Sequence, residues 1–284
     1  MITEQLIWFI DGRYFYKSIT LDKVIHLANT HKMRVKIIID AKVKSTQRWY
    51  WHAMVGDSPT ANEDLVVINK KKQTLLKALE MSAIKAEIIV SESADHIKTI
   101  NTELAKTNNG LLILEDTPPK QRHPIFQTLT EINAPVLLLT DKVWKENINA
   151  IGAVDPLHEN DRPAKIDEHI VQHLKSWEDS LSVKWKLIHC CYISSVLYQY
   201  KNKVLSMHQD GLKEFADQFR IKRDQYQLLE GLPEEALKSY INKNHIDILF
   251  IGLVNRNMLD KFWVGSTTSN FLYEPPCDLL LIKQ

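Results

Sequence analysis

Short runs of apolar residues recur along this chain and alternate with longer segments in which apolar residues return every three or four positions. The runs are continuously apolar, whereas a strand with one face in water would alternate apolar and polar residues. Continuously apolar strands are buried on both faces, as in a parallel sheet covered by helices. The pattern predicts strands at 6–10, 35–39, 88–90, 111–114, 136–139, 148–154, 185–191, 226–229, 246–251 and 279–282.

The segments between these runs predict helices, and strands that alternate with helices are typical of a doubly wound α/β fold. Pro233, Glu234 and Glu235 form a typical helix start, because proline fits the first turn and acidic side chains stabilise the positive helix end. The predicted helices span 21–31, 64–81, 94–106, 125–132, 167–177, 212–221, a segment from 233 and a segment that opens near 266.

The order of elements begins again halfway along the chain, which indicates an internal repeat. Asp11 and Asp155 each follow the first strand of a half, and an aromatic loop follows each second strand. We therefore expect two tandem five-stranded parallel-sheet α/β domains, at 1–143 and 144–284. We expect them to form a pseudo-twofold pair that meets through the strands 136–139 and 279–282, whose edges would otherwise stay exposed.

One stretch carries candidate chemistry. An apolar run ends at Gly252, and thirteen positions later Gly265 precedes Ser266, Thr267 and Thr268. Glycine lets the backbone approach an anion closely, and the N–H groups at a helix start attract one, so this layout suits a phosphate. From spacing alone, an ordinary strand–loop–helix connection with a Ser/Thr cap is the favoured explanation, because short motifs match by chance.

The charge of the chain is balanced, with 36 basic and 35 acidic residues, and gives no bulk argument for nucleic acid or an anionic membrane. The three cysteines, Cys190, Cys191 and Cys277, form no disulfide framework and favour a reducing compartment. No apolar segment is long enough to span a membrane, and the first residues lack the basic start of a signal peptide. We expect a cytoplasmic protein that binds neither nucleic acid nor membrane.

Two α/β repeats, an aspartate after each first strand, Gly231-Leu232-Pro233 after a third strand and the segment 252–267 resemble the universal stress protein family, in particular its tandem-domain subgroup. The resemblance covers essentially the whole chain and is strongest in the second half. It implies a Rossmann-like fold of the adenine nucleotide alpha hydrolase type. It also implies a stress-response factor that binds ATP or AMP with Mg²⁺, and is compatible with weak ATP hydrolysis and with a homodimer.

ATP-binding members of that family carry a glycine, two residues, a second glycine, nine residues, a third glycine and then serine or threonine. Asn255 replaces the second glycine here; asparagine tolerates positive φ, but its side chain can crowd a phosphate. The resemblance implies that Asp155 contacts the nucleoside and that Cys190 lies near adenine. The nucleotide-binding residues that it implies are Asp155, Cys190, Gly252, Asn255, Arg256, Gly265, Ser266 and Thr267.

The first half lacks this loop. No glycine occurs between Glu115 and Ala134, and Glu115 and Asp116 stand where a phosphate would lie. Two carboxylates would repel a triphosphate, so we expect any nucleotide to bind only in the second half.

Other candidate residues have simpler explanations. His169 and His173 lie one helical turn apart and could share a metal, but a solvated helix face is favoured because no third ligand is indicated. His189, Cys190 and Cys191 alternate along a buried strand, which favours core packing. His158, Glu159 and Asp161 share a loop without a specific metal-ligand spacing. We therefore assign no metal site from the sequence.

No set of nucleophile, base and orienting residue is apparent, so we assign no catalytic residue. The aromatic loop with Trp49, Tyr50 and Trp51 could stack on a ligand or pack between the halves. A nucleotide-free scaffold, or a binder of a small apolar ligand or protein partner, therefore remains the alternative to a nucleotide-binding stress protein.

Overall fold

The computed structural model describes residues 5–41, 61–93, 95–107, 109–157, 165–253 and 266–283. They form two compact units. The first unit comprises described residues within 3–115 and 123–133, and the second comprises those within 116–122 and from 134 onward. The predicted aromatic loop around Trp49 and the loop with His158, Glu159 and Asp161 lie outside the described residues.

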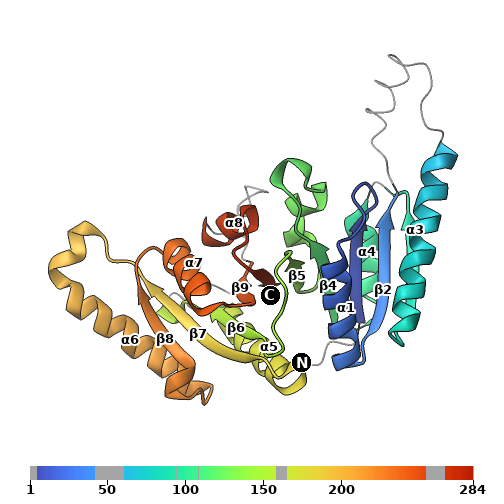
Figure 1. Cartoon of the computed structure of the whole chain (residues 1–284). Coiled ribbons are helices and arrows are strands. Elements are labelled where there is room, and N and C mark those ends of the chain that lie inside the picture. Colours follow the sequence, from blue (N-terminus) through green and yellow to red (C-terminus); the bar gives the residue numbers. More distant parts are fainter. Residues whose placement is uncertain are drawn as a thin grey trace. The chain divides into compact units, whose positions relative to one another are not determined.

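The first unit contains a parallel sheet in the order β3-β2-β1-β4. Figure 1 shows its helices packed around the strands. The strands are β1 (Gln5–Asp11), β2 (Arg34–Asp40), β3 (Ala86–Ser91) and β4 (Gly110–Glu115). The helices are α1 (Ser18–His31), α3 (Ala61–Met81), α4 (His96–Leu104) and the 3₁₀ turns η2 (Pro124–Gln127) and η3 (Leu129–Glu131).

The second unit contains a sheet in the order β5-β10-β9-β6-β7-β8, parallel except for β5. Its strands are β5 (Val136–Leu139), β6 (Asn149–Ala153), β7 (Lys184–Cys191), β8 (Tyr226–Glu230), β9 (Ile248–Gly252) and β10 (Asp278–Ile282). Its α-helices are α5 (Ile166–Leu181), α6 (Lys201–Gln218), α7 (Pro233–Asn244) and α8 (Ser266–Tyr273). Its 3₁₀ turns are η1 (Pro119–Gln121), η5 (Ser195–Tyr200) and η6 (Arg223–Gln225).

Burial on both faces, predicted from the continuously apolar runs, is confirmed for the central strands. All residues of β5 and β10 are buried, and so are the middle residues of β1, β4 and β9. β3 is the first strand in the order of the first unit and β8 the last in the order of the second, and both are only partly buried. The core side chains therefore come mainly from the other strands, and they include Trp8, Ile37 and Phe250.

Two predicted helices differ from the structure. The segment predicted as a helix at 125–132 forms the two 3₁₀ turns η2 and η3, which meet at Thr128, whose φ of −122° is not helical. α6 begins at Lys201 rather than near residue 212. Most side chains in its first half are exposed, so the sequence there has no apolar periodicity to detect.

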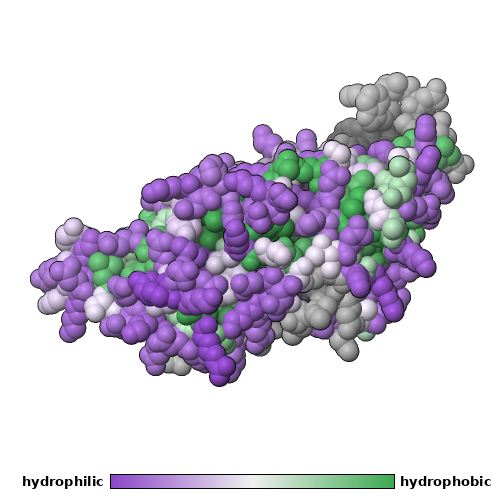
Figure 2. Space-filling model, turned by 60° about the horizontal axis from the view of Figure 1, so that its bottom comes forward, coloured by the Kyte–Doolittle hydropathy of each residue, from purple (hydrophilic) through white to green (hydrophobic). Residues whose placement is uncertain are grey.

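Figure 2 shows a mostly hydrophilic face with hydrophobic residues between the polar ones. Within the part of the chain that the structure describes, we find no helix with both the length and the apolar character needed to cross a bilayer.

The predicted contact between the two fifth strands is confirmed. β5 and β10 pair antiparallel, with Leu138 opposite Leu279 and Leu137 opposite Leu280. All four side chains are buried. An antiparallel pair joins these strands although every other strand pair of the second unit's sheet is parallel in the described residues.

Asp278, the first residue of β10, fixes the polar segment that follows β5. Its carboxylate is fully buried and accepts hydrogen bonds from the backbone N–H and the hydroxyl of Thr140, both at 2.7 Å. The indole N–H of Trp144 donates to the other carboxylate oxygen at 2.6 Å. The segment 140–144, which the sequence shows only as polar, is thereby held to the sheet by the buried carboxylate of Asp278.

His173 on α5 corrects the prediction of a solvated helix face. The side chain is partly buried, and burial, which disfavours the charged imidazolium, lowers its pKa to about 4. The nearby His169 places Nδ1 3.3 Å from the carbonyl oxygen of Lys283, which can only accept a hydrogen bond. His173 is therefore neutral near pH 7.

Replacing Asp278 should destabilise the protein. In Asp278→Ala the buried donors of Thr140 and Trp144 lose their acceptor, so we expect the free energy of unfolding to fall by about 2–4 kcal/mol. Urea unfolding of both proteins measures this. Asp217→Ala, at an exposed position of α6, is the matched control and should change stability by less than about 0.5 kcal/mol. Equal effects of the two substitutions would contradict the role of Asp278.

Acid should destabilise the protein partly through His173. Its folded pKa of about 4 lies below the ordinary value of 6.5, so the unfolded state binds more protons between these values. The free energy of unfolding should therefore fall as pH drops from about 6.5 to about 4, by up to about 3 kcal/mol from this group. His173→Gln should lose correspondingly less stability over the same window. Denaturant unfolding at pH 7 and pH 4 tests this, and parallel pH dependences in the two proteins would refute it.

Candidate functional site

The chain reverses its direction of travel across the second unit's sheet between β6 and β9. β7 and β8 follow β6 on one side, and β9 and β10 lie on the other. Ala150 pairs with Ile248 and Gly152 with Phe250, so β6 and β9 end at the same edge. In open α/β sheets ligands bind beyond the carboxyl ends of the strands at such a reversal. This edge is therefore the candidate site.

Asp155, which follows β6, lies at this edge. Its backbone N–H donates to Oδ2 of Asp167, a buried residue in the first turn of α5, at 2.8 Å. Its own side chain is 27% exposed, and Oδ1 lies 3.9 Å from Nδ1 of His189. The structure thus holds the backbone of Asp155 and leaves part of its carboxylate accessible, as a ligand contact requires.

His189 does more than fill the core. Its Nδ1 lies 3.1 Å from the carbonyl oxygen of Val154, so this nitrogen carries the proton and donates. Nε2 of His189 then accepts from Nδ1 of His208, at 2.7 Å. The sequence analysis gave His208 no role, because α6 was predicted to start four residues beyond it. The two histidines connect α6 to the edge next to Asp155.

Cys190 lies one residue before the end of β7, next to Asp155. Burial, and secondly the charge of Asp155, raises the pKa of its thiol to about 12, so the thiol stays protonated at neutral pH. A protonated, largely buried thiol behaves as a small apolar group. This is compatible with the predicted position against a flat ring, which stays a prediction.

Gly252 has a packing reason to be glycine. An added Cβ would lie 2.6 Å from Cγ2 of Ile166, at the start of α5. Thr268, which is buried, donates its hydroxyl to the carbonyl oxygen of Gly252 at 3.1 Å. This bond ties the first turn of α8 to the end of β9. The hydroxyl proton of Thr268 is thus used in a hydrogen bond to the backbone.

The predicted helix start at Ser266 is confirmed, because α8 begins there and Thr267 is partly buried in its first turn. Asn255, Arg256 and Gly265 lie outside the described residues. The structure therefore brings Asp155, Cys190 and Gly252 to the ends of three neighbouring strands.

The first unit has the corresponding reversal between β1 and β4. The acidic residues there, Glu115 and Asp11, already have partners within the unit. Glu115 accepts the backbone N–H of Lys17, just before α1, with both carboxylate oxygens at 3.2 Å. Asp11 binds the guanidinium of Arg13 through Nε, at 2.9 and 3.0 Å, and through Nη2. The carboxylate of Glu115 thus binds an N–H group at the start of α1, where an external anion could otherwise bind.

Asp116, the second acid predicted to exclude phosphate, belongs to the second unit. It pairs with Arg122 at 2.9 Å, and the same guanidinium nitrogen donates to the carbonyl oxygen of Tyr273. This acid therefore holds a loop against the end of α8.

Comparison with known proteins agrees with this geometry. The model of the universal stress protein family matches residues 192–283. Universal stress protein E of Salmonella typhi is 22% identical over 208 residues, which cover 69% of this chain and 64% of that protein. Universal stress protein E of Photorhabdus laumondii is 21% identical over 171 residues, covering 56% of this chain and 54% of that protein. The matched region thus spans between about half and two thirds of these relatives.

The fold extends over the whole chain. The crystal structure of a universal stress protein from Archaeoglobus fulgidus superposes with a TM-score of 0.63 at 12% identity, covering 98% of this chain and 96% of that one. The family match over residues 192–283 and the curated relatives show that part of this chain is similar in sequence to universal stress proteins, and the structural neighbour shows that the fold is similar over the whole chain.

Proposed function

We propose that this chain is a cytoplasmic stress-response protein that binds one adenine nucleotide, ATP with Mg²⁺ or AMP, in its second unit. The observation that carries the proposal is the reversal between β6 and β9, with the partly exposed Asp155 on one side and Gly252 on the other. The similarity of residues 192–283 to the universal stress protein family supports the stress-response role. Binding, not catalysis, is the proposed activity.

The roles in this proposal follow from the chemistry of each group. Asp155 accepts hydrogen bonds from the ribose hydroxyls, because a carboxylate is an acceptor with several lone pairs. The protonated thiol of Cys190 contacts the adenine ring. Phosphates bind the N–H groups at the start of α8, whose first turn is anchored by the Thr268–Gly252 bond. In the first unit, the pairing of Glu115 with Lys17 at the start of α1 opposes a phosphate there.

One observation favours the second candidate, a nucleotide-free binder of an apolar ligand or a protein partner. The segment after β7, which includes η5 and the first half of α6, exposes large apolar and aromatic side chains. Exposed groups of this kind can mark an interaction surface. They are Tyr192, Val196, Leu197, Tyr198, Tyr200 and Met207.

The nucleotide content of the purified protein separates the two candidates. Under the first, extraction should release an adenine nucleotide that mass spectrometry identifies, and the ratio of absorbance at nucleic-acid and protein wavelengths should exceed the value expected from the sequence. Absence of nucleotide, together with no calorimetric binding of added ATP or AMP, would favour the second candidate.

Asp155→Ala should weaken ATP binding by about tenfold or more. A hydrogen bond to a charged group contributes about 1.5–3 kcal/mol, and about 1.4 kcal/mol corresponds to a factor of ten in Kd. Asp11→Ala is the matched control, because Asp11 occupies the corresponding place in the first unit but is bound to Arg13. Titration calorimetry with both variants tests the assignment. Equal loss in the two variants would argue against a site confined to the second unit.

Three further variants test the phosphate end. Ser266→Ala should weaken ATP binding by about tenfold if its hydroxyl bonds a phosphate. Asn255→Gly should strengthen binding, because it restores the turn of ATP-binding relatives and removes a side chain from the phosphates. Glu115→Gly should not create a second binding event. A second calorimetric transition in Glu115→Gly, or unchanged affinity in Ser266→Ala, would place the site elsewhere.

A further inference from the structure

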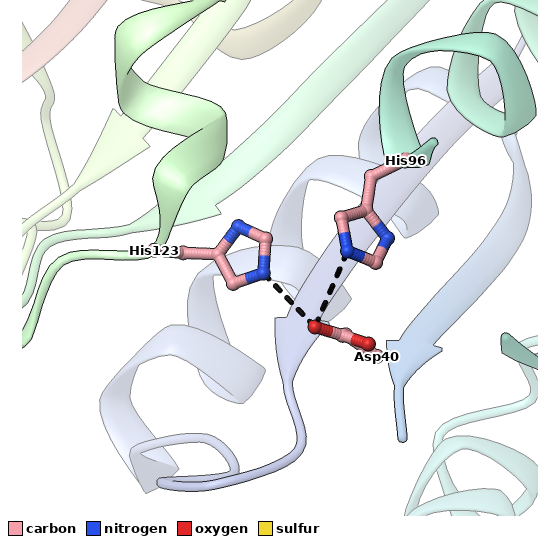
Figure 3. Close-up of side chains that lie close together, drawn as sticks. All are labelled: Asp40, His96 and His123. Atoms are coloured by element: carbon pink, nitrogen blue, oxygen red, sulfur yellow. Dashed lines mark hydrogen bonds and ion pairs between the residues drawn. The ribbon is translucent and has the colours of Figure 1, made fainter. Parts of the chain in front are cut away.

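Three potential metal ligands converge in the first unit, far from the residues of the proposed nucleotide site in the sequence. Asp40 ends β2, His96 begins α4, and His123 precedes the 3₁₀ turn η2. Figure 3 shows both imidazole rings turned toward the carboxylate of Asp40. The three ligand atoms all lie within 4.8 Å of one another. The sequence analysis missed this group, because the three residues lie on separate elements with no characteristic spacing.

The distances suit a shared metal ion. Nε2 of His123 lies 2.9 Å and Nε2 of His96 3.4 Å from the same oxygen, Oδ2 of Asp40. Zinc bonds of about 2.0–2.1 Å in a tetrahedron place neighbouring ligand atoms about 3.3 Å apart. The two measured separations lie on either side of that value. The longer one exceeds the usual range of an N–H···O hydrogen bond, about 2.7–3.2 Å.

The surroundings also suit a metal ion. Asp40 and His123 are each 7% exposed, and His96 is 12% exposed at the side chain. The ring of Phe9 contacts both imidazoles edge-on, at centroid distances of 5.5 and 5.0 Å, so one wall of the group is apolar. The nearby Arg13 is paired with Asp11, so its positive charge is compensated. With both imidazoles in the neutral form that binds a metal, the group carries the single negative charge of Asp40, which favours a cation.

We propose that Asp40, His96 and His123 bind one divalent transition-metal ion, with Zn²⁺ the ion that this ligand set suits. Imidazole is a preferred ligand of zinc, and two histidines with one carboxylate recur in zinc sites and in non-haem iron sites. Three protein ligands leave a fourth position for water, as in catalytic zinc sites. The site is independent of the proposed nucleotide function, because all its residues belong to the first unit.

Metal binding would exchange existing hydrogen bonds for coordination. Nδ1 of His123 accepts the backbone N–H of Ile125 at 3.1 Å, so in this arrangement the ring proton of the neutral imidazole is on Nε2 and points to Asp40. A metal ion at Nε2 moves that proton to Nδ1, and the bond from Ile125 must open. The ion therefore couples the ligand group to the turn 123–125, and loading should alter the backbone signal of Ile125.

The test is zinc binding to the full chain after chelator treatment, without added nucleotide. The wild type should bind one equivalent of Zn²⁺ more than each of Asp40→Asn, His96→Gln and His123→Gln, by equilibrium dialysis and elemental analysis. Each variant should bind Zn²⁺ at this site at least about 100-fold more weakly than the wild type. Loss of a residue that only supports a metal ligand typically costs less than that. His26→Gln, at an exposed position of α1, is the matched control and should bind as the wild type does.

Two further measurements keep the test decisive if a variant unfolds. Co²⁺ bound to the wild type should give the visible absorption of a low-coordinate nitrogen and oxygen site, and Zn²⁺ but not Mg²⁺ should abolish it, because Mg²⁺ prefers oxygen ligands. Anomalous diffraction at the zinc edge should place the ion next to Oδ2 of Asp40. Equal zinc binding in the wild type and in folded variants, or an anomalous peak elsewhere and none at Asp40, would overturn the proposal.

Discussion

Burial of the central strands on both faces is the constraint on which the rest of this structure depends. Trp8, Ile37 and Phe250 are fully enclosed, and their neighbours along the strands are buried as well. A polar side chain in the middle of such a strand loses its hydration and needs a partner there, as Lys36 on β2 has in Glu103. The candidate site residues Asp155, Gly252 and Asp40 accordingly lie where strands end, and the carboxyl ends of parallel strands lie at one edge of the sheet.

The two halves of the repeat use this edge in different ways. In the first unit, Glu115 and Asp11 bind residues of the same unit, and Asp40 gathers two imidazoles. In the second unit, the carboxylate of Asp155 stays partly exposed. At this edge the first unit has acidic side chains that are bound to other residues of the unit. The second unit has a partly exposed carboxylate, that of Asp155.

Two residues of the predicted phosphate-binding segment, Gly252 and Thr268, have structural roles that do not involve a ligand. Gly252 is needed where α5 begins, because Ile166 leaves no room for a Cβ, and Thr268 holds the start of α8 to the end of β9. Packing alone can therefore explain why glycine and threonine stand at these two positions. The low identity to the relatives, 21–22%, is compatible with this, since close packing at a few positions preserves the fold while most side chains vary.

The sequence by itself determined the strands and most of the helices, because continuous apolar runs and helical periodicity are local properties that burial on two faces or one face imposes. It also placed Asp155 and Gly252 at strand ends, since those residues directly follow apolar runs. Only the tertiary structure decided that Asp278 anchors Thr140 and Trp144, and that His208 reaches His189. It also brought His123 to Asp40, 83 positions away. Contacts between distant elements depend on how helices and loops pack on the sheet, and no local spacing in the sequence records that packing.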